Sequence, residues 1–262
     1  MTVLIRGAGD IASGIALRLY HAGMRVAMTE IAKPTTIRRT VAFSEAVISG
    51  RQTVEDVTAQ YAENHEEALS LMEQGIIPVL VDPEGLIRKA LSPDAEVDAI
   101  LAKRNLGTRI DDAPVVVGVG PGFTAGADCH AVVETMRGHT LGRVFYTGSA
   151  LPNTNIPGLI GGFAGERVIR APADGIFHGI RQIGDMVGES ETVGYVGEIP
   201  VKTTIAGMLR GLLADGISVT KGMKSGDVDP RGKKEYCYLV SDKALAVAGG
   251  VLEAILCLSE RF

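Results

Sequence analysis

The sequence has no tryptophan, only three cysteines and no long uninterrupted hydrophobic run. The cysteines form an odd set without C-x-x-C spacing, which predicts reduced thiols in a cytoplasm rather than disulfides or a zinc site. They are Cys129, Cys237 and Cys257. The apolar stretch 244–258 is interrupted by Glu253 and is too short to span a bilayer. Arg6 and Asp10 interrupt the first apolar run, which argues against a signal peptide.

An excess of positive charge is also lacking, because the formal net charge is −5 and the pI is about 5.6. Binding of nucleic-acid phosphates needs a basic surface, so no nucleic-acid partner is expected. The hydrophobic content of 46% is typical of a soluble globular protein. A chain of 262 residues is long enough for one large or two modest domains.

Glycine is abundant, with 33 residues, and the most informative glycines follow the apolar run Val3-Leu4-Ile5. They form a G-x-G-x-x-A match that precedes a helical pattern over 11–22 and a second apolar run over 25–29. In such a corner the first glycine permits the turn, the second lets the backbone approach a pyrophosphate, and the small third residue allows close helix packing. The matched residues are Gly7, Ala8, Gly9, Asp10, Ile11 and Ala12.

Glu30 ends the second predicted strand, 23 positions after Gly7. A carboxylate there can accept hydrogen bonds from ribose hydroxyls, which favours NAD over NADP, although FAD, AMP and S-adenosylmethionine share this feature. Arg38 and Arg39 could reverse that preference or bind a second anionic group, and the alternative is a solvated arginine pair. We therefore expect a nucleotide site at this corner, the alternative being a glycine-rich turn that binds nothing.

Continuous apolar runs at 76–81, 97–101 and 115–119 fit parallel strands that are buried on both faces. Their alternation with helical patterns predicts an α/β fold, a Rossmann-like doubly wound parallel sheet. Ligands in this architecture bind past the carboxyl ends of the strands. The loop 118–126, with Gly120 and Gly122, is a second candidate for binding, although it lacks the Lys-Ser/Thr ending of a P-loop.

His130 and Glu134 are the candidate catalytic residues, with His130 as a general acid or base. On a helix their side chains would stack within one turn and could share a metal ion. On a strand, which the β-branched residues of this segment favour, they lie about 13 Å apart. No metal site is therefore predicted, and a hydrogen-bonded structural histidine is the alternative for His130.

A change of pattern near Gly165 predicts three parts: a nucleotide-binding domain over 1–165, a small β domain over 166–236 and a C-terminal helix over 237–262 that packs back on the first domain. The second part contains a repeat with an offset of 32 residues. This offset relates Gly175 to Gly207, Gly184 to Gly216, and Val187 to Val219. Its segments 171–177 and 183–187 resemble the barrel-sandwich hybrid of biotinyl and lipoyl domains. A carrier function is not expected, because Lys202 lies too close to Gly207 for a hairpin-tip lysine.

Motifs that span nearly all of the chain give it a resemblance to one family. They are Arg6–Gly14, Arg38–Ala46, Lys103–Thr108, Gly120–Phe123, His130–Thr135, Gly138–Arg143, Leu209–Leu212 and Gly226–Arg231. With these motifs the chain resembles the selenium-dependent molybdenum hydroxylase accessory proteins, whose nucleotide-binding domain is similar to that of xanthine dehydrogenase maturation factors.

The resemblance implies an accessory protein in the maturation of a selenium-dependent molybdenum hydroxylase, which would be its client and partner. It would bind NAD or another adenine dinucleotide, or a molybdopterin dinucleotide that carries the molybdenum cofactor, at the glycine turn. The alternative is a stand-alone NAD-dependent oxidoreductase acting on a small substrate. We expect a cytoplasmic homo-oligomer without membrane contact, and whether the chain is an enzyme is left open.

Overall fold

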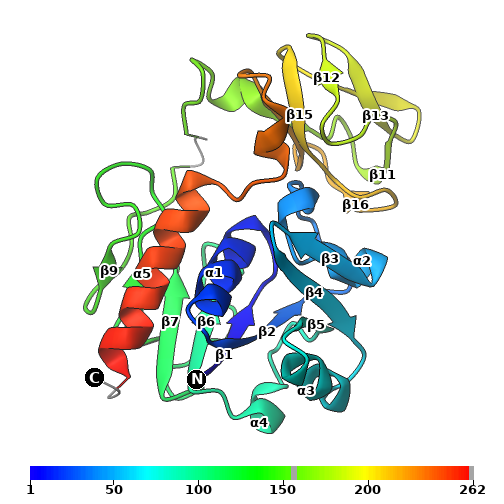
Figure 1. Cartoon of the computed structure of the whole chain (residues 1–262). Helices are drawn as coiled ribbons and strands as arrows, with labels where there is room; N and C mark the ends of the chain where they lie inside the picture. The colour runs from blue at the N-terminus through cyan, green and yellow to red at the C-terminus, as the bar shows by residue number, and fades with distance from the viewer. Residues whose placement is uncertain (155–157, 260–262) are drawn as a thin grey trace. The chain divides into compact units, whose positions relative to one another are not determined.

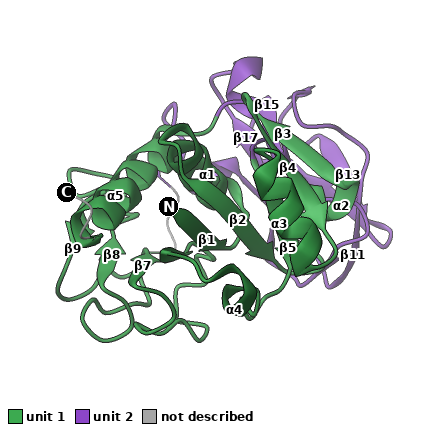
Figure 2. Cartoon of the chain, turned by 60° about the horizontal axis from the view of Figure 1, so that its bottom comes forward, with its two compact units in different colours: residues 1–34, 42–154, 240–262 green, residues 35–41, 155–239 purple. Residues whose placement is uncertain are grey.

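A computed structural model of the chain describes residues 1–154 and 158–259. The chain divides into two compact units, coloured differently in Figure 2. Unit 1 consists of Met1–Pro34, Ala42–Thr154 and Val240–Phe262, and unit 2 of Thr35–Val41 and Asn155–Leu239. Unit 2 is therefore assembled from two separate stretches of the sequence.

Unit 1 is built on one nine-stranded sheet. Its strands are β1 (Thr2–Arg6), β2 (Arg25–Glu30), β3 (Arg51–Val54), β4 (Val57–Ala62), β5 (Ile77–Val81), β6 (Ala95–Asp98), β7 (Val115–Val119), β8 (Ala131–Val133) and β9 (Val144–Phe145). Their spatial order is β3-β4-β5-β2-β1-β6-β7-β8-β9, as Figure 1 shows for the central strands. The seven strands from β4 to β8 in this order are parallel, and the two edge strands are antiparallel to their neighbours.

Three longer helices cover this sheet: α1 (Asp10–His21), α3 (His65–Glu73) and α5 (Asp242–Leu258). Helix α1 forms because Ile11, Ile15 and Leu19 recur at helical spacing and are buried. Helices α1 and α5 pack against each other (Figure 1). Their contact is close because Gly14 has no side chain, and a Cβ there would lie 2.7 Å from the Cβ of Ala244.

The N-terminus of α5 is capped by Ser241, whose hydroxyl accepts a hydrogen bond of 3.2 Å from the amide of Ala244. Helix α3 lies against β5 and β2 and joins Leu4 and Leu80 in one buried cluster. The remaining helices, α2 (Glu45–Ser49) and α4 (Arg88–Leu91), are single turns. In residues 1–154 and 158–259, no helix is both long enough and apolar enough to cross a membrane.

Unit 2 contains two four-stranded antiparallel sheets, β10-β17-β15-β12 and β14-β13-β11-β16. Their strands are β10 (Val168–Arg170), β11 (Gly175–Gly179), β12 (Met186–Val187), β13 (Thr192–Val196), β14 (Ile199–Lys202), β15 (Gly207–Leu212), β16 (Ser218–Val219) and β17 (Lys224–Asp229). The single-turn 3-10 helices η1 (Arg39–Val41), η2 (Gly165–Arg167) and η3 (Lys234–Cys237) flank them.

The core of unit 2 is apolar and includes Phe177, Leu209 and Val228. Ile37, from the short stretch 35–41, belongs to the same core. Its carbonyl accepts a hydrogen bond of 2.8 Å from the amide of Leu212 in β15. The short stretch is thus part of the interior of unit 2.

The predicted Rossmann-like doubly wound fold with a barrel-sandwich domain is wrong. The large sheet is mixed, and unit 2 has two separate antiparallel sheets. Within the described residues, the connections 99–114 and 120–130 contain no helix, so the second half of a doubly wound arrangement is missing. The polar, glycine-rich sequences of these connections lack the apolar period that a covering helix needs.

Candidate ligand-binding site

The turn after β1 is shaped by Gly7, whose φ of +91° favours glycine. The Gly7 amide donates a hydrogen bond of 2.9 Å to the carbonyl of Thr29, which ties the turn to β2. A Cβ at this position would lie 2.9 Å from the carbonyl oxygen of Ala99. The turn and the residue that follows β6 are therefore in direct backbone contact.

The Glu30 carboxylate faces the same turn. Its Oε2 accepts a hydrogen bond of 3.0 Å from the Ala8 amide, and its Oε1 accepts one of 2.8 Å from the Ile31 amide. Burial raises the pKa of Glu30 above its ordinary value of 4.5, while these two hydrogen bonds oppose the rise. The end of β2 thus places an acid at the glycine turn, at the position that the sequence predicts for a ribose-binding carboxylate.

The segment that begins α2 covers part of the turn. The Ala8 carbonyl accepts hydrogen bonds from the Ser44 amide at 2.8 Å and from the Ser13 hydroxyl at 3.2 Å. The Ser13 oxygen in turn accepts one from the Phe43 amide at 2.7 Å. Ala8 is buried, whereas Gly9 is half-buried. The accessible part of the corner is therefore the N-terminus of α1.

Helix α1 begins after Gly9, which offers no side chain to cap it. The first amides of any helix have no acceptor inside the helix, and the helix dipole favours negative charge there. Ile11 and Ala12 are buried in the first turn and anchor it on the sheet. At this corner the helix N-terminus is suited to bind an anion, and the carboxylate beside it is suited to accept hydrogen bonds from hydroxyl groups.

Arg38 and Arg39 belong to unit 2, whereas the glycine corner belongs to unit 1. The Arg38 Nη2 donates hydrogen bonds of 3.1 Å to the carbonyls of Tyr236 and Leu239. The Arg39 Nε donates one of 3.0 Å to the carbonyl of Leu212. Both side chains therefore bind the backbone of their own unit.

Gly120 and Gly122 adopt φ values of +81° and +115° and allow close backbone packing. A Cβ at Gly122 would lie 2.6 Å from the Cα of Arg104, and one at Gly120 would lie 2.9 Å from the hydroxyl of Thr135. Phe123 is buried in the same loop. The contacts of this loop are thus with neighbouring protein segments.

The segment of His130 and Glu134 is a strand, β8, as its β-branched residues predict. The two residues flank opposite ends of the strand and do not share a site. The His130 Nδ1 accepts a hydrogen bond of 3.0 Å from the Val116 amide. The buried Glu134 carboxylate accepts three, from the amides of Thr135, Met136 and Leu151. No cluster of three or more potential metal ligands occurs among the described residues.

A buried charge cluster lies directly behind the glycine corner. The Asp98 carboxylate accepts a hydrogen bond of 2.6 Å from the Thr108 hydroxyl. Arg6 pairs with Asp98 at 3.6 Å and donates to Thr108 at 2.5 Å. Arg6 and Asp98 are register partners in β1 and β6, and they directly precede Gly7 and Ala99.

Glu96 extends the cluster and pairs with Arg88 at 3.1 Å, and Arg88 also pairs with Asp112. Burial raises the pKa of Glu96 to about 7, with the charge of Arg88 opposing the rise and that of Asp112 adding to it. The sequence analysis missed these residues. The available signal was the alternation Ala95-Glu96-Val97-Asp98, two acids at every second position of a buried strand.

Taken together, unit 1 is an α/β unit with a glycine corner, an acid at its rim and a buried charge cluster behind it. No protein-family model matches the chain. It is 57% identical over 256 residues to the uncharacterized protein YqeB of Escherichia coli strain K12, an alignment that covers 98% of this chain and 47% of that protein. The chain thus spans about half the length of this curated relative.

Similar solved structures include a succinylglutamate desuccinylase/aspartoacylase from Rhodobacter sphaeroides, with a TM-score of 0.25 and 12% identity over 87% of this chain and 85% of that one. An aspartoacylase family protein from Mesorhizobium loti has a TM-score of 0.28 and 11% identity over 87% and 84% of the two chains. Likeness this weak carries no conclusion about the activity of the present chain.

These comparisons correct the sequence-based identification. The predicted membership in the selenium-dependent molybdenum hydroxylase accessory family is wrong, because no protein-family model matches the chain and the relative is described only as an uncharacterized protein. The predicted maturation function and the alternative of an NAD-dependent oxidoreductase are wrong for the same reason. The predicted partners, a client enzyme and further copies of the chain, stay predictions.

Proposed function

We propose that unit 1 binds a small nucleoside phosphate, such as AMP, at the corner formed by Gly7–Ala12 and Glu30. The observation that carries the proposal is the Glu30 carboxylate held 3.0 Å from the Ala8 amide, beside the N-terminus of the 12-residue helix α1. Hydroxyl groups of a ribose would donate to the carboxylate, and the phosphate would lie at the helix N-terminus.

Glu30 can accept these hydroxyl groups without giving up its present hydrogen bonds. Each of its oxygens accepts one backbone amide, and a carboxylate oxygen has a second lone pair for another donor. The two amides also fix the orientation of the carboxylate, so a ligand would not have to order it. The proposal is limited to binding, because the Glu134 carboxylate is engaged by three backbone amides and lies away from His130.

The test compares AMP, 2′-deoxy-AMP and adenosine by isothermal titration calorimetry and by thermal unfolding. A ligand that binds only the folded chain must raise its melting temperature. We expect AMP to bind, 2′-deoxy-AMP to bind about tenfold more weakly because one hydroxyl is lost, and adenosine to bind weakly because the phosphate is lost. No change in melting temperature with millimolar AMP, ADP or ATP would rule the proposal out.

The variant Glu30→Gln separates the role of the carboxylate from general stability. The ratio of AMP affinity to 2′-deoxy-AMP affinity is measured within each variant, so a loss of stability alone does not change it. We expect the ratio to fall toward one in Glu30→Gln and to stay unchanged in Glu73→Gln, which alters an exposed acid at the end of α3.

A reducing, cytoplasmic location is part of the proposal, and the three free cysteines support it. Cys129 and Cys237 are buried, and burial raises the pKa of the Cys129 thiol to about 11, which keeps it protonated. Fractionation of cells that express the tagged chain should recover it with cytoplasmic markers, and recovery with an extracytoplasmic fraction would refute this location.

A further inference from the structure

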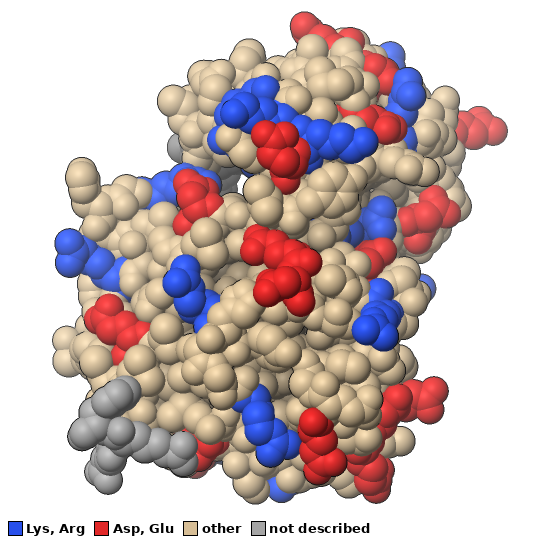
Figure 3. Space-filling view, in the orientation of Figure 1, with Lys and Arg blue, Asp and Glu red and all other residues tan. Residues whose placement is uncertain are grey.

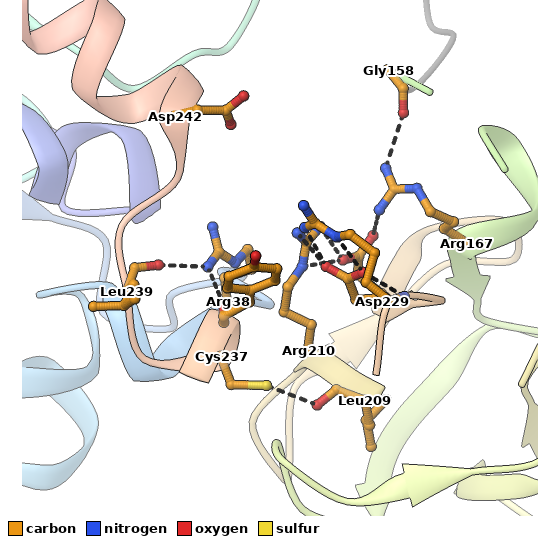
Figure 4. Close-up of polar contacts among 12 residues, drawn as sticks. Arg38, Gly158, Arg167, Leu209, Arg210, Asp229, Cys237, Leu239 and Asp242 are labelled. Carbon is orange, nitrogen blue, oxygen red and sulfur yellow. Dashed lines mark hydrogen bonds and ion pairs between the residues drawn. The ribbon is translucent and has the colours of Figure 1, made fainter. Parts of the chain in front are cut away.

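Unit 2 contains a largely buried network of arginines and aspartates in and beside strands β15 and β17, which we call the arginine cluster. It consists of Arg167, Arg210, Arg231, Asp227 and Asp229. Asp227 accepts hydrogen bonds from Arg167 at 2.9 Å and from the Nε of Arg210 at 2.8 Å. Asp229 accepts from Arg210 at 3.1 Å and from Arg231 at 2.7 Å. Figure 4 shows Arg210 between Arg38 and Arg167.

The arginine cluster has more cations than acids, because three guanidinium groups surround two carboxylates. Burial raises the pKa of Asp229, but the hydrogen bonds from Arg231 and the charges of Arg210 and Arg231 outweigh it, and the pKa falls below its ordinary value. Asp229 therefore stays ionised at neutral pH, and its oxygens accept hydrogen bonds from Arg210 and Arg231. One excess positive charge remains within the network.

Further cations surround the same place. Arg38 donates hydrogen bonds of 3.1 Å to the carbonyls of Tyr236 and Leu239, on either side of Cys237 in the sequence, and Lys234 lies in the same 3-10 helix as Cys237. The Arg231 Cζ lies 4.4 Å from the centre of the Tyr236 ring, and the Lys233 Nζ lies 5.4 Å from it. Cations from widely separated segments of unit 2 thus converge around β15 and η3.

The local charge is opposite in sign to that of the whole chain. Arg38, Lys233 and Lys234 together with the three arginines of the cluster make six cations. Five acids lie in the same segments or beside β15, namely Glu166, Asp185, Asp227, Asp229 and Glu235. An excess of one positive charge therefore remains here, in a chain whose net charge is −5. Figure 3 shows Lys and Arg side chains, with an acidic side chain among them, over the short orange helix that Figure 1 draws beside β15. Concentrated charge of one sign attracts a ligand of the other sign.

We propose that this cationic surface of unit 2 binds a multiply charged phosphate anion of the pyrophosphate type. Guanidinium forks and lysine ammonium groups are the side chains that proteins use to bind phosphate oxygens. The Arg231 side chain is 41% exposed, and Lys233 and Lys234 are exposed, so an anion can reach them. Arg38, Arg167 and Arg210 are buried behind them and supply a fixed positive field.

The probe is inorganic pyrophosphate, titrated calorimetrically into the full chain at low and at high salt. We expect it to bind more tightly than orthophosphate or sulfate, and to weaken as salt rises because exposed charges are screened. ADP carries the same diphosphate on a nucleoside, so equal affinity for ADP would show that the phosphate chain alone is recognised. A clear preference for free pyrophosphate would identify the inorganic anion as the source. The chain has no tryptophan, so tyrosine fluorescence, which includes Tyr236, gives a second readout.

The double variant Lys233→Gln/Lys234→Gln removes two exposed charges and leaves the buried network intact. We expect pyrophosphate affinity to fall about tenfold. The matched control, Lys202→Gln/Lys221→Gln, removes two exposed lysines elsewhere in unit 2 and should change affinity by less than about twofold. Equal losses in both double variants, or no measurable pyrophosphate binding at low salt, would overturn the proposal.

Glu30→Gln distinguishes this site from the nucleoside phosphate site of unit 1. Pyrophosphate affinity should be unchanged in Glu30→Gln, because that acid belongs to unit 1 and recognises hydroxyl groups. If Glu30→Gln alters pyrophosphate binding and Lys233→Gln/Lys234→Gln does not, the anion binds at the glycine corner and unit 2 has no such site. Failure of AMP binding would leave the expectation for pyrophosphate unaffected.

Discussion

Glu96 is a carboxyl group with no exposed side-chain surface, and its Oε2 has no hydrogen-bond partner among the described residues. One salt bridge to Arg88 does not replace the hydration that Glu96 loses, so the buried group favours its protonated form up to about pH 7. A strand in the middle of the sheet thus carries a group that titrates near neutral pH. The unfolded chain, in contrast, ionises this residue near its ordinary pKa.

The stability of the chain should therefore depend on Glu96 between about pH 4.5 and pH 7, the ordinary and the raised pKa of this group. The folded state holds a proton that the unfolded state releases, so stability falls as pH rises through this window, by up to about 3 kcal/mol. Glu96→Gln mimics the protonated form and should remove this part of the slope. Urea unfolding of both chains across the window measures it, with Glu73→Gln as the control. Parallel pH profiles for Glu96→Gln and the unaltered chain would contradict the expectation.

Glu134 was predicted from the sequence as a catalytic residue. In the structure its carboxylate accepts hydrogen bonds from three backbone amides. Its two oxygens accept hydrogen bonds of 2.6, 2.7 and 2.8 Å that tie together the end of β8 and the segment at Leu151. The sequence pattern His-x-x-x-Glu does not indicate that the glutamate binds backbone amides.

Glu134→Gln should destabilise unit 1 by about 2–4 kcal/mol, because an amide offers one acceptor oxygen and places an NH2 group against a backbone donor. Chemical denaturation measures the loss, and AMP affinity at the glycine corner should stay the same. A variant as stable as the original chain would show that the three hydrogen bonds contribute little.

At the scale of single elements, much of unit 1 could be predicted from the sequence. The corner β1–α1–β2 follows from apolar runs on both sides of a glycine turn, and the observed α1 begins one residue before the predicted helix. A C-terminal helix is present as α5, Asp242–Leu258, with Ser241 as its cap. These elements carry their signals locally, in apolar spacing and in capping residues.

Other elements were missed because their signals are weaker or act over long range. The hairpin of β3 and β4 lies in a segment where no strand was predicted, and its turn places Glu55 at a φ of +54° without glycine. The buried positions of Glu96 and Asp98 could not be inferred, since charged residues are usually exposed. One of their partners, Arg6, which pairs with Asp98, also lies at a distant point of the sequence.

The contact of α5 with its neighbours gives a matched pair of variants at Gly249 and Gly250. A Cβ at Gly250 would collide with the carbonyl oxygen of Gly142 and lie 2.8 Å from Val133, whereas nothing lies within 4 Å of one at Gly249. Gly249→Ala should stabilise the chain by about 0.8 kcal/mol through helix propensity alone. Gly250→Ala should destabilise it by more than about 1 kcal/mol because the helix must move.

Thermal and urea unfolding of the two variants test this contrast. Both variants gain the same methyl group on adjacent residues of one helix, so their difference isolates packing from propensity. Stabilisation by Gly250→Ala would mean that α5 does not pack closely at this position.

At the scale of the whole molecule, the sequence analysis identified strands but did not determine how they assemble. An apolar run predicts a buried strand but not whether the edge strands beside it are antiparallel. The connections without helices have no apolar period from which their course could be predicted. The placement of residues 35–41 in unit 2 could not be predicted either, because Ile37 and Val41 are the only apolar residues of this short, polar segment. These features depend on contacts between distant parts of the chain.

Ile37→Ala should therefore weaken unit 2, although the residue lies in the sequence between two parts of unit 1. Its side chain belongs to the buried core with Leu209 and Val228, so the cost should be about 2–4 kcal/mol. Hydrogen exchange should show lost protection in β15 and little change in β2. The reverse pattern would assign Ile37 to the core of unit 1.

The chain passes between its two units four times, because each unit takes in separate stretches of the sequence. A proteolytic cut in any one of these passages would leave the two units covalently joined through the other three, so no single cut would release either unit. A gene fragment that encodes residues 155–239 alone would also lack Ile37, which completes the interior of unit 2. Recombination of one continuous gene segment could therefore not transfer unit 2 complete. We expect the two units to have evolved together in one chain.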